Sequence, residues 1–321
     1  MVVRSDAVVN APRAPWAAPG CDTVNLVYYD VTNSHSQCPG SLSMSASPTS
    51  ITPAGPLRGA DHDRGLQALQ VQVVAVAQPC ASLLRLVIQL PEQAALAPWQ
   101  RANTAVRIQL GATFGDVSRI YTVRSLDPNT RQFTLDVVLH EAPGPILAWV
   151  RALRPGDAFD LTGPRPHLQV PQREGTCTLL FADPSAIPAL FALMQQWPTG
   201  LHAQAWIASD DAFPVDELPA IEGIRVHRLA TGDAPLLQQA RRLHPDANNT
   251  VWAAGEREEM RALRRHFIET VGLPRSDVAV AGYWKRGETT TETDQRRRRN
   301  YERVLARGGG LQDLDDLADD I

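Results

Sequence analysis

A change of hydrophobic pattern part-way along this 321-residue chain most constrains its fold. Residues 66–165 contain six short apolar runs separated by Pro, Gly, Asn and Asp, with one helical segment at 146–153. Short strands at this spacing are typical of a small antiparallel barrel or sandwich. From 175 to 285, apolar strands alternate with helices, which indicates a parallel α/β sheet. The predicted strands are 176–182, 202–208, 224–229, 249–255 and 277–283, and the predicted helices are 185–197, 234–243 and 256–272. We therefore predict an antiparallel β-barrel domain at 65–170, followed by a parallel α/β domain of the nucleotide-binding type at 171–288.

The two ends of the chain differ from this central part. Residues 1–64 are rich in Ser, Pro, Ala, Thr and Asn and show no sustained hydrophobic period, so we expect a disordered extension. Met44 offers an alternative start, and a native protein that begins there would lack residues 1–43. Residues 289–321 form a polar tail, and apolar residues at helical spacing near its end predict a short amphipathic helix.

Composition excludes several classes of function. The net charge of −4 argues against a protein that binds nucleic acid through bulk positive charge, so we interpret the arginine run at 296–299 as a solvated helix face. The four cysteines show no CxxC spacing, and no metal site is indicated. The chain has no apolar run of about 18 residues and no signal-peptide pattern in its first 30 residues. We therefore expect no membrane span and a cytoplasmic location.

The string RIYTVR at 119–124 is the most specific candidate for chemistry. On a strand, its spacing places Arg119, Tyr121 and Val123 on one face, and Thr122 and Arg124 on the other. This combination suits a flavin, because the aromatic ring can stack on the isoalloxazine, the hydroxyl can bond near N5, and a guanidinium can pair with a pyrophosphate. An edge strand with solvated arginines explains the spacing equally well.

A second candidate is the helix that starts near Ile146. A Pro-Gly-Pro segment at 143–145 leads into it, so its first N–H groups are free to receive a phosphate. His140 precedes this segment and is placed to contact the same phosphate.

Eight short strings follow one another along the chain: RIYTVR (119–124), VLHxxxGPxxxW (138–149), PGD (155–157), GPR (163–165), DxxAIPA (183–189), VWAAGE (251–256), RALRRH (261–266) and GYWKRG (282–287). Their order and wording resemble the siderophore-interacting protein family, which comprises flavin-dependent ferric-siderophore reductases with a ferredoxin-reductase-like architecture. The resemblance covers about 66–288, and although each string alone is weak, eight in the expected order are specific.

The resemblance implies an FAD-binding barrel, a nicotinamide-nucleotide site on the α/β domain, and Tyr121 and Thr122 at the reacting ring. The residues it implies for FAD are Arg119, Tyr121, Thr122, Val123, Arg124, His140, Gly144, Ile146 and Leu147. The residues it implies for the nicotinamide nucleotide are Asp183, Ala254, Gly255 and Glu256. Those it places near the far side of the flavin are Tyr283, Trp284 and Lys285.

The chain departs from the family's usual pattern at five positions. Three departures concern FAD: Glu141 for a usual Gly, Leu147 for a usual Ser, and the pair Pro166 and His167 for a usual Gly-Ser. The fourth, Pro184 for a usual Glu, concerns the nucleotide site.

The implied reaction is electron transfer from NADPH or NADH through FAD to Fe(III) in a siderophore, with release of Fe(II). A reduced ferredoxin is an alternative donor. Ferric chelates can be anionic, so cationic residues are candidates for capturing them. Lys285 is the sole lysine and follows Tyr-Trp, whereas a solvated surface charge is the simpler explanation for Arg85 and Arg286.

Three alternatives stay open. The first is a general NAD(P)H reductase of the flavin or ferredoxin type with another electron acceptor. The second is a non-catalytic binder of flavin or siderophore, which the departures at 147, 166–167 and 184 would favour. The weakest is a regulator that uses the 296–299 arginines on DNA.

Overall fold

The structure, a computed structural model, describes residues 66–139, 144–173 and 175–287, with isolated positions between 299 and 307. The extension predicted at 1–64 and the helix predicted near the C-terminus lie outside the described residues and stay predictions. Arg299 is the described member of the arginine run, and it is exposed.

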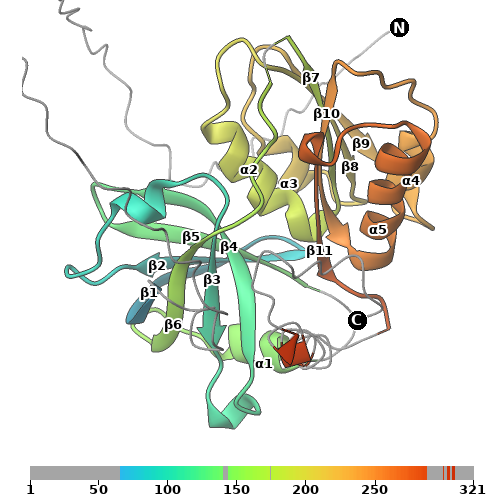
Figure 1. The fold of residues 1–321 in the computed structure, drawn as a ribbon. Helices are drawn as coiled ribbons and strands as arrows, with labels where there is room; N and C mark the ends of the chain where they lie inside the picture. Colours follow the sequence, from blue (N-terminus) through green and yellow to red (C-terminus); the bar gives the residue numbers. More distant parts are fainter. Residues whose placement is uncertain are drawn as a thin grey trace, which may run out of the picture. The chain divides into compact units, whose positions relative to one another are not determined.

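Six antiparallel strands form a closed barrel, as predicted (Figure 1). Around the barrel the strands follow the order β1-β2-β5-β4-β3-β6, and β6 pairs back with β1. Apolar side chains such as Leu86, Ile88 and Leu135 fill the interior and have no exposed surface. The strands are β1 (Gln67–Cys80), β2 (Leu83–Gln89), β3 (Thr104–Gln109), β4 (Ser118–Asp127), β5 (Gln132–Val138) and β6 (Ala158–Pro166).

Short helical segments complete the barrel. The helix α1 (Pro145–Ala152) lies between β5 and β6 in the sequence, and it begins one residue before the predicted start. Trp149 of α1 is buried and meets Phe159 of β6 edge to face, with 5.1 Å between ring centroids. This contact anchors α1 to the barrel. The other segments are 3-10 turns, η2 (Ala97–Gln100) and η3 (Ala112–Phe114).

Five parallel strands form the second sheet, in the order β11-β10-β7-β8-β9. From the central β7 the chain runs outward to β8 and β9, then returns to β10 and β11 on the other side of β7. The topological switch point is therefore between β7 and β10, where open α/β sheets bind ligands at the carboxyl ends of the strands. The strands are β7 (Cys177–Ala182), β8 (His202–Ala208), β9 (Ile224–Leu229), β10 (Asn249–Glu256) and β11 (Val278–Trp284).

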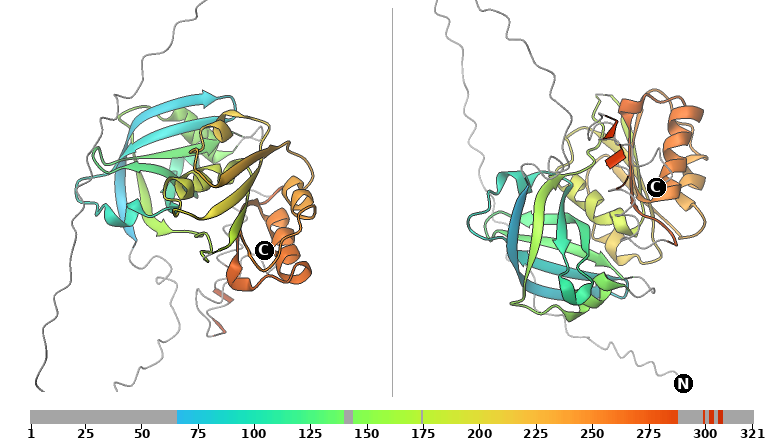
Figure 2. Two further views of the ribbon diagram at one scale, coloured as in Figure 1. Left: turned by 90° about the horizontal axis from the view of Figure 1, so that it is seen from above. Right: turned by 60° about the horizontal axis from the view of Figure 1, so that its bottom comes forward.

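Helices cover both faces of this sheet (Figures 1 and 2). On one face, α2 (Ile187–Gln195) and α3 (Phe213–Asp216) share a core with the sheet. On the other, α4 (Pro235–Ala240) and α5 (Arg257–Arg265) form a second core. The remaining turns are η4 (Pro184–Ala186), η5 (His266–Thr270), which is π-helical, and η6 (Arg275–Asp277).

These elements confirm the predicted order of an antiparallel barrel and a parallel α/β sheet. The structure adds the four-residue α3, which the sequence pattern did not predict, and divides the helix predicted over 256–272 into α5 and η5. The domain boundaries near residues 65, 170 and 288 stay predictions.

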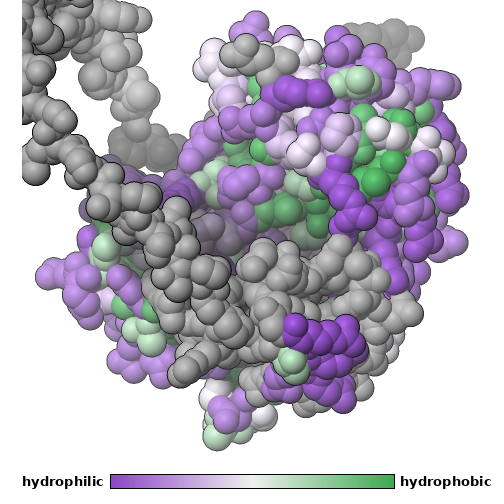
Figure 3. Space-filling view, viewed as in Figure 1, coloured by the Kyte–Doolittle hydropathy of each residue, from purple (hydrophilic) through white to green (hydrophobic). Residues whose placement is uncertain are grey.

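The face of the molecule drawn in Figure 3 is mainly polar where it is coloured. Figure 3 shows hydrophilic residues over most of the coloured surface on one face, with smaller hydrophobic areas among them. Among the helices of the described residues, none is long and apolar enough to span a membrane.

Candidate functional site

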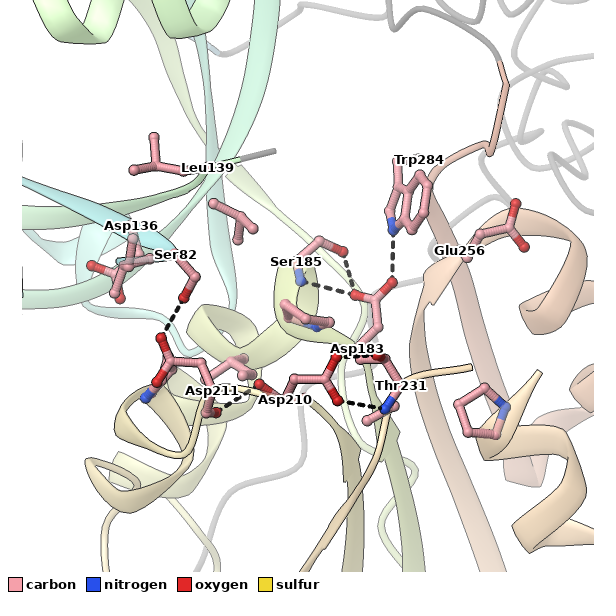
Figure 4. A pocket seen from close by; sticks show the side chains of 18 of the residues that line it. Ser82, Asp136, Leu139, Asp183, Ser185, Asp210, Asp211, Thr231, Glu256 and Trp284 are labelled. Carbon is pink, nitrogen blue, oxygen red and sulfur yellow. Dashed lines mark hydrogen bonds between the residues drawn. The ribbon is translucent and has the colours of Figure 1, made fainter. Parts of the chain in front are cut away.

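A cavity of about 340 Å³ lies where the parallel strands end, and both the barrel and the sheet line it (Figure 4). Ser82 and Leu139 are among the barrel residues that line it. Asp183, Ser209 and Glu256 line it from the carboxyl ends of β7, β8 and β10. Because this edge includes the switch point of the sheet, the cavity is the expected position for a nucleotide.

The turn after β7 is tied to the end of β11 through Asp183. Its carboxylate accepts hydrogen bonds from the Ser185 N–H at 2.9 Å and from the Ser185 hydroxyl at 2.5 Å. It also accepts from the indole Nε1 of Trp284 at 2.7 Å, as Figure 4 shows. Burial raises the pKa of Asp183, although these hydrogen bonds act in the opposite direction. The predicted nucleotide residue Asp183 therefore also holds Trp284 at the cavity wall.

The turn after β10 approaches Asp183 closely. A Cβ atom added at Gly255 would lie 2.7 Å from the Asp183 carboxyl carbon, so only glycine fits there. Glu256 lines the cavity, accepts from the Glu259 N–H at 2.9 Å, and accepts from the Arg286 N–H at 3.1 Å. Ala254 is fully buried in the core, and its carbonyl accepts from the Asp183 N–H at 3.4 Å. Of the four residues predicted for the nucleotide, two thus line the cavity and two shape the turn.

The strand predicted to hold a flavin is β4. Tyr121 is half-buried against the barrel core, and burial raises the pKa of its hydroxyl, partly offset by the Arg119 charge. Val123 belongs to the core itself. Arg119 is buried, and its guanidinium donates to the Ser118 carbonyl at 2.7 Å. The predicted split of this strand into two faces agrees with the core positions of Tyr121 and Val123.

Tyr283 connects β11 to this strand. Burial raises the pKa of its hydroxyl, and the neighbouring side chains of Asn103 and Thr122 act in the opposite direction. The hydroxyl also lies 3.4 Å from Nδ1 of His167, and the two rings meet edge to face. His167, one of the residues that depart from the family's usual pattern, therefore packs against the Tyr283 side chain. Tyr283 thus brings the end of β11 close to β4, the strand predicted to hold a flavin.

The guanidinium of Arg124 lies beside the ion pairs of Arg85. Arg85 pairs with Asp136 at 2.7 Å and with Glu217 at 2.7 Å. Arg124 pairs with the same carboxylates at 3.0 and 3.1 Å, and its guanidinium carbon lies 3.4 Å from the centroid of the Phe191 ring. We name these four charged residues the clasp, because they join three barrel strands to α3. The cofactor role of Arg124 and the substrate role of Arg85 stay predictions that these ion pairs do not favour.

The N-terminus of α1 fits a phosphate. Gly144 is its N-cap, Pro145 has no N–H, and no side chain caps the first turn. The geometry of a helix leaves the N–H groups of Ile146 and Leu147 without partners inside the helix. The Leu147 side chain is buried, so the departure at this position leaves the backbone donor in place. His140 and Glu141 lie outside the described residues.

The cationic candidates follow β11. Lys285 is half-buried, and Arg286 is exposed and lines the cavity. Within the described ranges, no cluster of three or more His, Cys, Asp or Glu side chains is arranged to hold a metal ion.

Family models match the barrel and the parallel sheet separately. The model of the siderophore-interacting FAD-binding domain matches residues 72–168, and that of the siderophore-interacting protein matches 176–287. The chain is 33% identical over 272 residues to the ferric acinetobactin reductase of Acinetobacter baumannii, covering 81% of this chain and 93% of that protein. The chain belongs to the siderophore-interacting protein family. The predicted resemblance is thereby confirmed.

Solved structures agree with this family. The siderophore-interacting protein from Acinetobacter baumannii superposes with a TM-score of 0.72 at 32% identity, covering 75% of this chain and 99% of that one. A ferredoxin reductase of a carbazole 1,9a-dioxygenase superposes with a TM-score of 0.55 at 13% identity, covering 68% of this chain and 70% of that one. The second likeness shows the ferredoxin-reductase-like fold alone.

Sequence reasoning missed several polar residues of the cavity, among them three at the carboxyl ends of strands. Asp210 and Asp211 follow β8, and Thr231 follows β9. Their position directly after predicted strands was the available signal, since side chains at the carboxyl ends of parallel strands meet at one edge.

Proposed function

We propose that this protein is a flavin-dependent ferric-siderophore reductase that takes its electrons from a pyridine nucleotide. The observation that carries the proposal is the position of Tyr283 beside Thr122, next to a cavity lined by both barrel and sheet. It brings the predicted flavin strand to the predicted nucleotide site. The relative named ferric acinetobactin reductase supports the substrate class.

The residues of this chain fit FAD at two positions. The uncapped first turn of α1 would receive the pyrophosphate through the backbone of Ile146 and Leu147. Tyr121 and Thr122 would contact the ring, with the Tyr283 side chain beside Thr122. When bound, FAD supplies the capacity to accept a hydride and to return electrons singly.

The sheet residues would orient the electron donor. The turns at 183–185 and 255–256 border the switch point, where a nicotinamide nucleotide can extend toward β4. Trp284, fixed by its hydrogen bond to Asp183, would close one side of this path and exclude water from it. A reduced ferredoxin as donor stays a prediction. A cytoplasmic location also stays a prediction, and it agrees with the use of a pyridine nucleotide.

The substrate would be a ferric chelate in which the siderophore supplies the iron ligands. Lys285 and Arg286 would attract an anionic chelate to the end of β11, next to Tyr283. The flavin would then be reached from the nucleotide side by the donor and from the β11 side by the iron complex.

The experiment is anaerobic spectroscopy on the full chain. Purified protein should carry or take up FAD, its flavin absorbance should bleach with NADH or NADPH, and a ferric siderophore should restore it while a ferrous chelator traps Fe(II). Bleaching that quinones reverse and ferric siderophores do not would show a general reductase instead. Failure to take up FAD would favour the alternative of a non-catalytic siderophore-binding protein without reductase activity.

A further inference from the structure

The cavity has two distinguishable ends. The sheet order is β11-β10-β7-β8-β9, so β11 and β9 are its opposite edges. Tyr283 of β11 lies beside Thr122 of β4 and contacts His167, whose N–H bonds the Asn103 carbonyl just before β3, the neighbour of β4. The β11 side is therefore the end nearer the strand predicted to hold the flavin. A dinucleotide whose nicotinamide reaches the flavin must therefore place its adenosine toward the ends of β8 and β9.

Two carboxylates are fixed at that adenosine end. The Asp210 carboxylate accepts from the Thr231 N–H at 3.0 Å and also from the Thr231 hydroxyl. The Asp211 carboxylate accepts from the Ser82 hydroxyl at 2.7 Å and from the Phe213 N–H at 3.0 Å. All of these residues except Phe213 line the cavity, and Figure 4 shows both carboxylates there.

The charge at this end is negative. The hydrogen bonds to Asp210 and Asp211, those from Thr231 and Ser82 foremost, lower the pKa of both carboxyl groups, so they are ionised at neutral pH. Arg228 of β9 is the opposing charge, and its guanidinium donates to the main-chain carbonyls of Ser209 and Asp210 at 3.1 and 3.2 Å. Arg228 is not among the cavity-lining residues.

Acidic residues also line the rest of the cavity, where Asp136 is paired with Arg85 and Arg124 and burial raises the pKa of Asp183 and Glu259. Among the described residues that line it, one is basic, Arg286, and it lies after β11 at the other end. Six are acidic: Asp136, Asp183, Asp210, Asp211, Glu256 and Glu259. A phosphate on the adenosine ribose would thus meet carboxylates and no lining cation at that end of the described cavity.

We propose that Asp210, supported by Asp211, makes this enzyme select NADH over NADPH. The inference rests on the proposed function. An acidic residue at the end of a strand in a dinucleotide-binding sheet can accept a hydrogen bond from the ribose 2′-hydroxyl. NADPH replaces that donor with a phosphate of about −1.5 to −2 charges at neutral pH, which the two carboxylates repel.

The direct test is equilibrium binding of fragments that lack the nicotinamide. ADP-ribose and 2′-phospho-ADP-ribose are titrated calorimetrically into the FAD-loaded full chain. ADP-ribose should bind at least about tenfold more tightly, and added salt should narrow the difference, because part of it is charge repulsion. Equal affinities, or tighter binding of the 2′-phosphorylated fragment, would overturn the inference.

Variants assign the preference to a residue. Asp210→Asn should reduce the ratio of the two affinities to about threefold or less, and Asp210→Glu, which keeps the charge, should preserve it. Asp216→Asn is the matched control, because Asp216 is exposed on α3 and outside the cavity lining. If Asp210→Asn fails to fold, Asp211→Asn should reduce the ratio in the same direction. An unchanged ratio in every neutralised variant that folds contradicts the assignment.

The rate of flavin reduction by each nucleotide distinguishes a failure of this inference from a failure of the proposed function on which it rests. Faster bleaching by NADPH than by NADH would overturn the selection of NADH and leave the reductase intact. Failure of both nucleotides to bind and to bleach the flavin would overturn the pyridine-nucleotide donor, and the inference with it.

Discussion

Glu217, at the end of α3, accepts a hydrogen bond from Arg124 of β4 at 3.1 Å, so a helix of the parallel sheet is tied to the strand predicted to hold a flavin. Arg124 is three residues after Tyr121. The clasp therefore helps to set how the predicted flavin ring faces the predicted nucleotide site. Arg85 and Arg124, which the sequence suggested as ligand-binding residues, thus join elements of the fold in this structure.

Removing the Glu217 charge should loosen this connection. Glu217→Gln leaves two guanidinium groups with one carboxylate, Asp136, and should lower the free energy of unfolding by about 1–3 kcal/mol. Urea denaturation at neutral pH measures the change. Asp216→Asn, an exposed neighbour, should shift the midpoint little.

The same interaction predicts a pH dependence. Burial alone would raise the pKa of Glu217, but the hydrogen bond from Arg85 and the charge of Arg124 outweigh it and lower the pKa. The stabilisation is therefore complete above the ordinary glutamate pKa of 4.5 and is lost as the pH falls through the lower folded-state value. The stability difference between wild type and Glu217→Gln should shrink in this acid range. A difference that stays constant into acid would show that the charge is not responsible.

Arg119→Ala should weaken FAD retention. The guanidinium is buried on the flavin strand, and its removal takes a positive charge from the region expected to hold a pyrophosphate. We expect the FAD dissociation constant to rise about tenfold, measured by flavin fluorescence during reconstitution. Arg101→Ala, in an exposed turn before β3, is the control and should bind FAD normally.

Lys285→Ala should affect the iron substrate and spare the flavin. We expect the KM for anionic ferric chelates to rise roughly three- to tenfold, with unchanged FAD affinity, because the lost charge attracts the chelate. Steady-state kinetics with a ferrous chelator measure this. Equal KM values in the variant and the wild type would remove Lys285 from the substrate site, and Arg275→Ala controls for loss of an exposed charge.

Gly255→Ala should disrupt the nucleotide site. The added Cβ would lie 2.7 Å from the Asp183 carboxyl carbon, so the turn that also holds Trp284 must shift. We expect binding of ADP-ribose to fall at least about tenfold while the barrel still takes up FAD. Asp216→Asn is the control, since Asp216 is exposed and lies outside the cavity lining. Normal binding by Gly255→Ala would contradict the close approach.

The strands were predictable because their apolar runs are local features. The predicted strand at 202–208 coincides with β8, and that at 224–229 with β9. Partners distant in sequence were not predictable. Glu217 is 93 positions from Arg124, and nothing near either residue announces the pair.

The same limit applies to burial and to the cavity. Arg257 begins an amphipathic helix rich in surface arginines, yet it is 1% exposed because Gly282 of β11 allows its backbone to approach. The acidic end of the cavity combines Asp210 and Thr231, which follow different strands. Sequence placed each after a strand, and only the sheet order places them together.

The central claim is that electrons pass from a pyridine nucleotide to chelated iron through this protein, and electron counting tests it most directly. Under anaerobic conditions, FAD-loaded protein is mixed with limiting NADH, excess ferric siderophore and a ferrous chelator. Because a hydride carries two electrons, we expect about two Fe(II) trapped for each NADH oxidised, and none in protein stripped of FAD. NADH oxidation without Fe(II), or Fe(II) formation that is independent of FAD, would contradict the account.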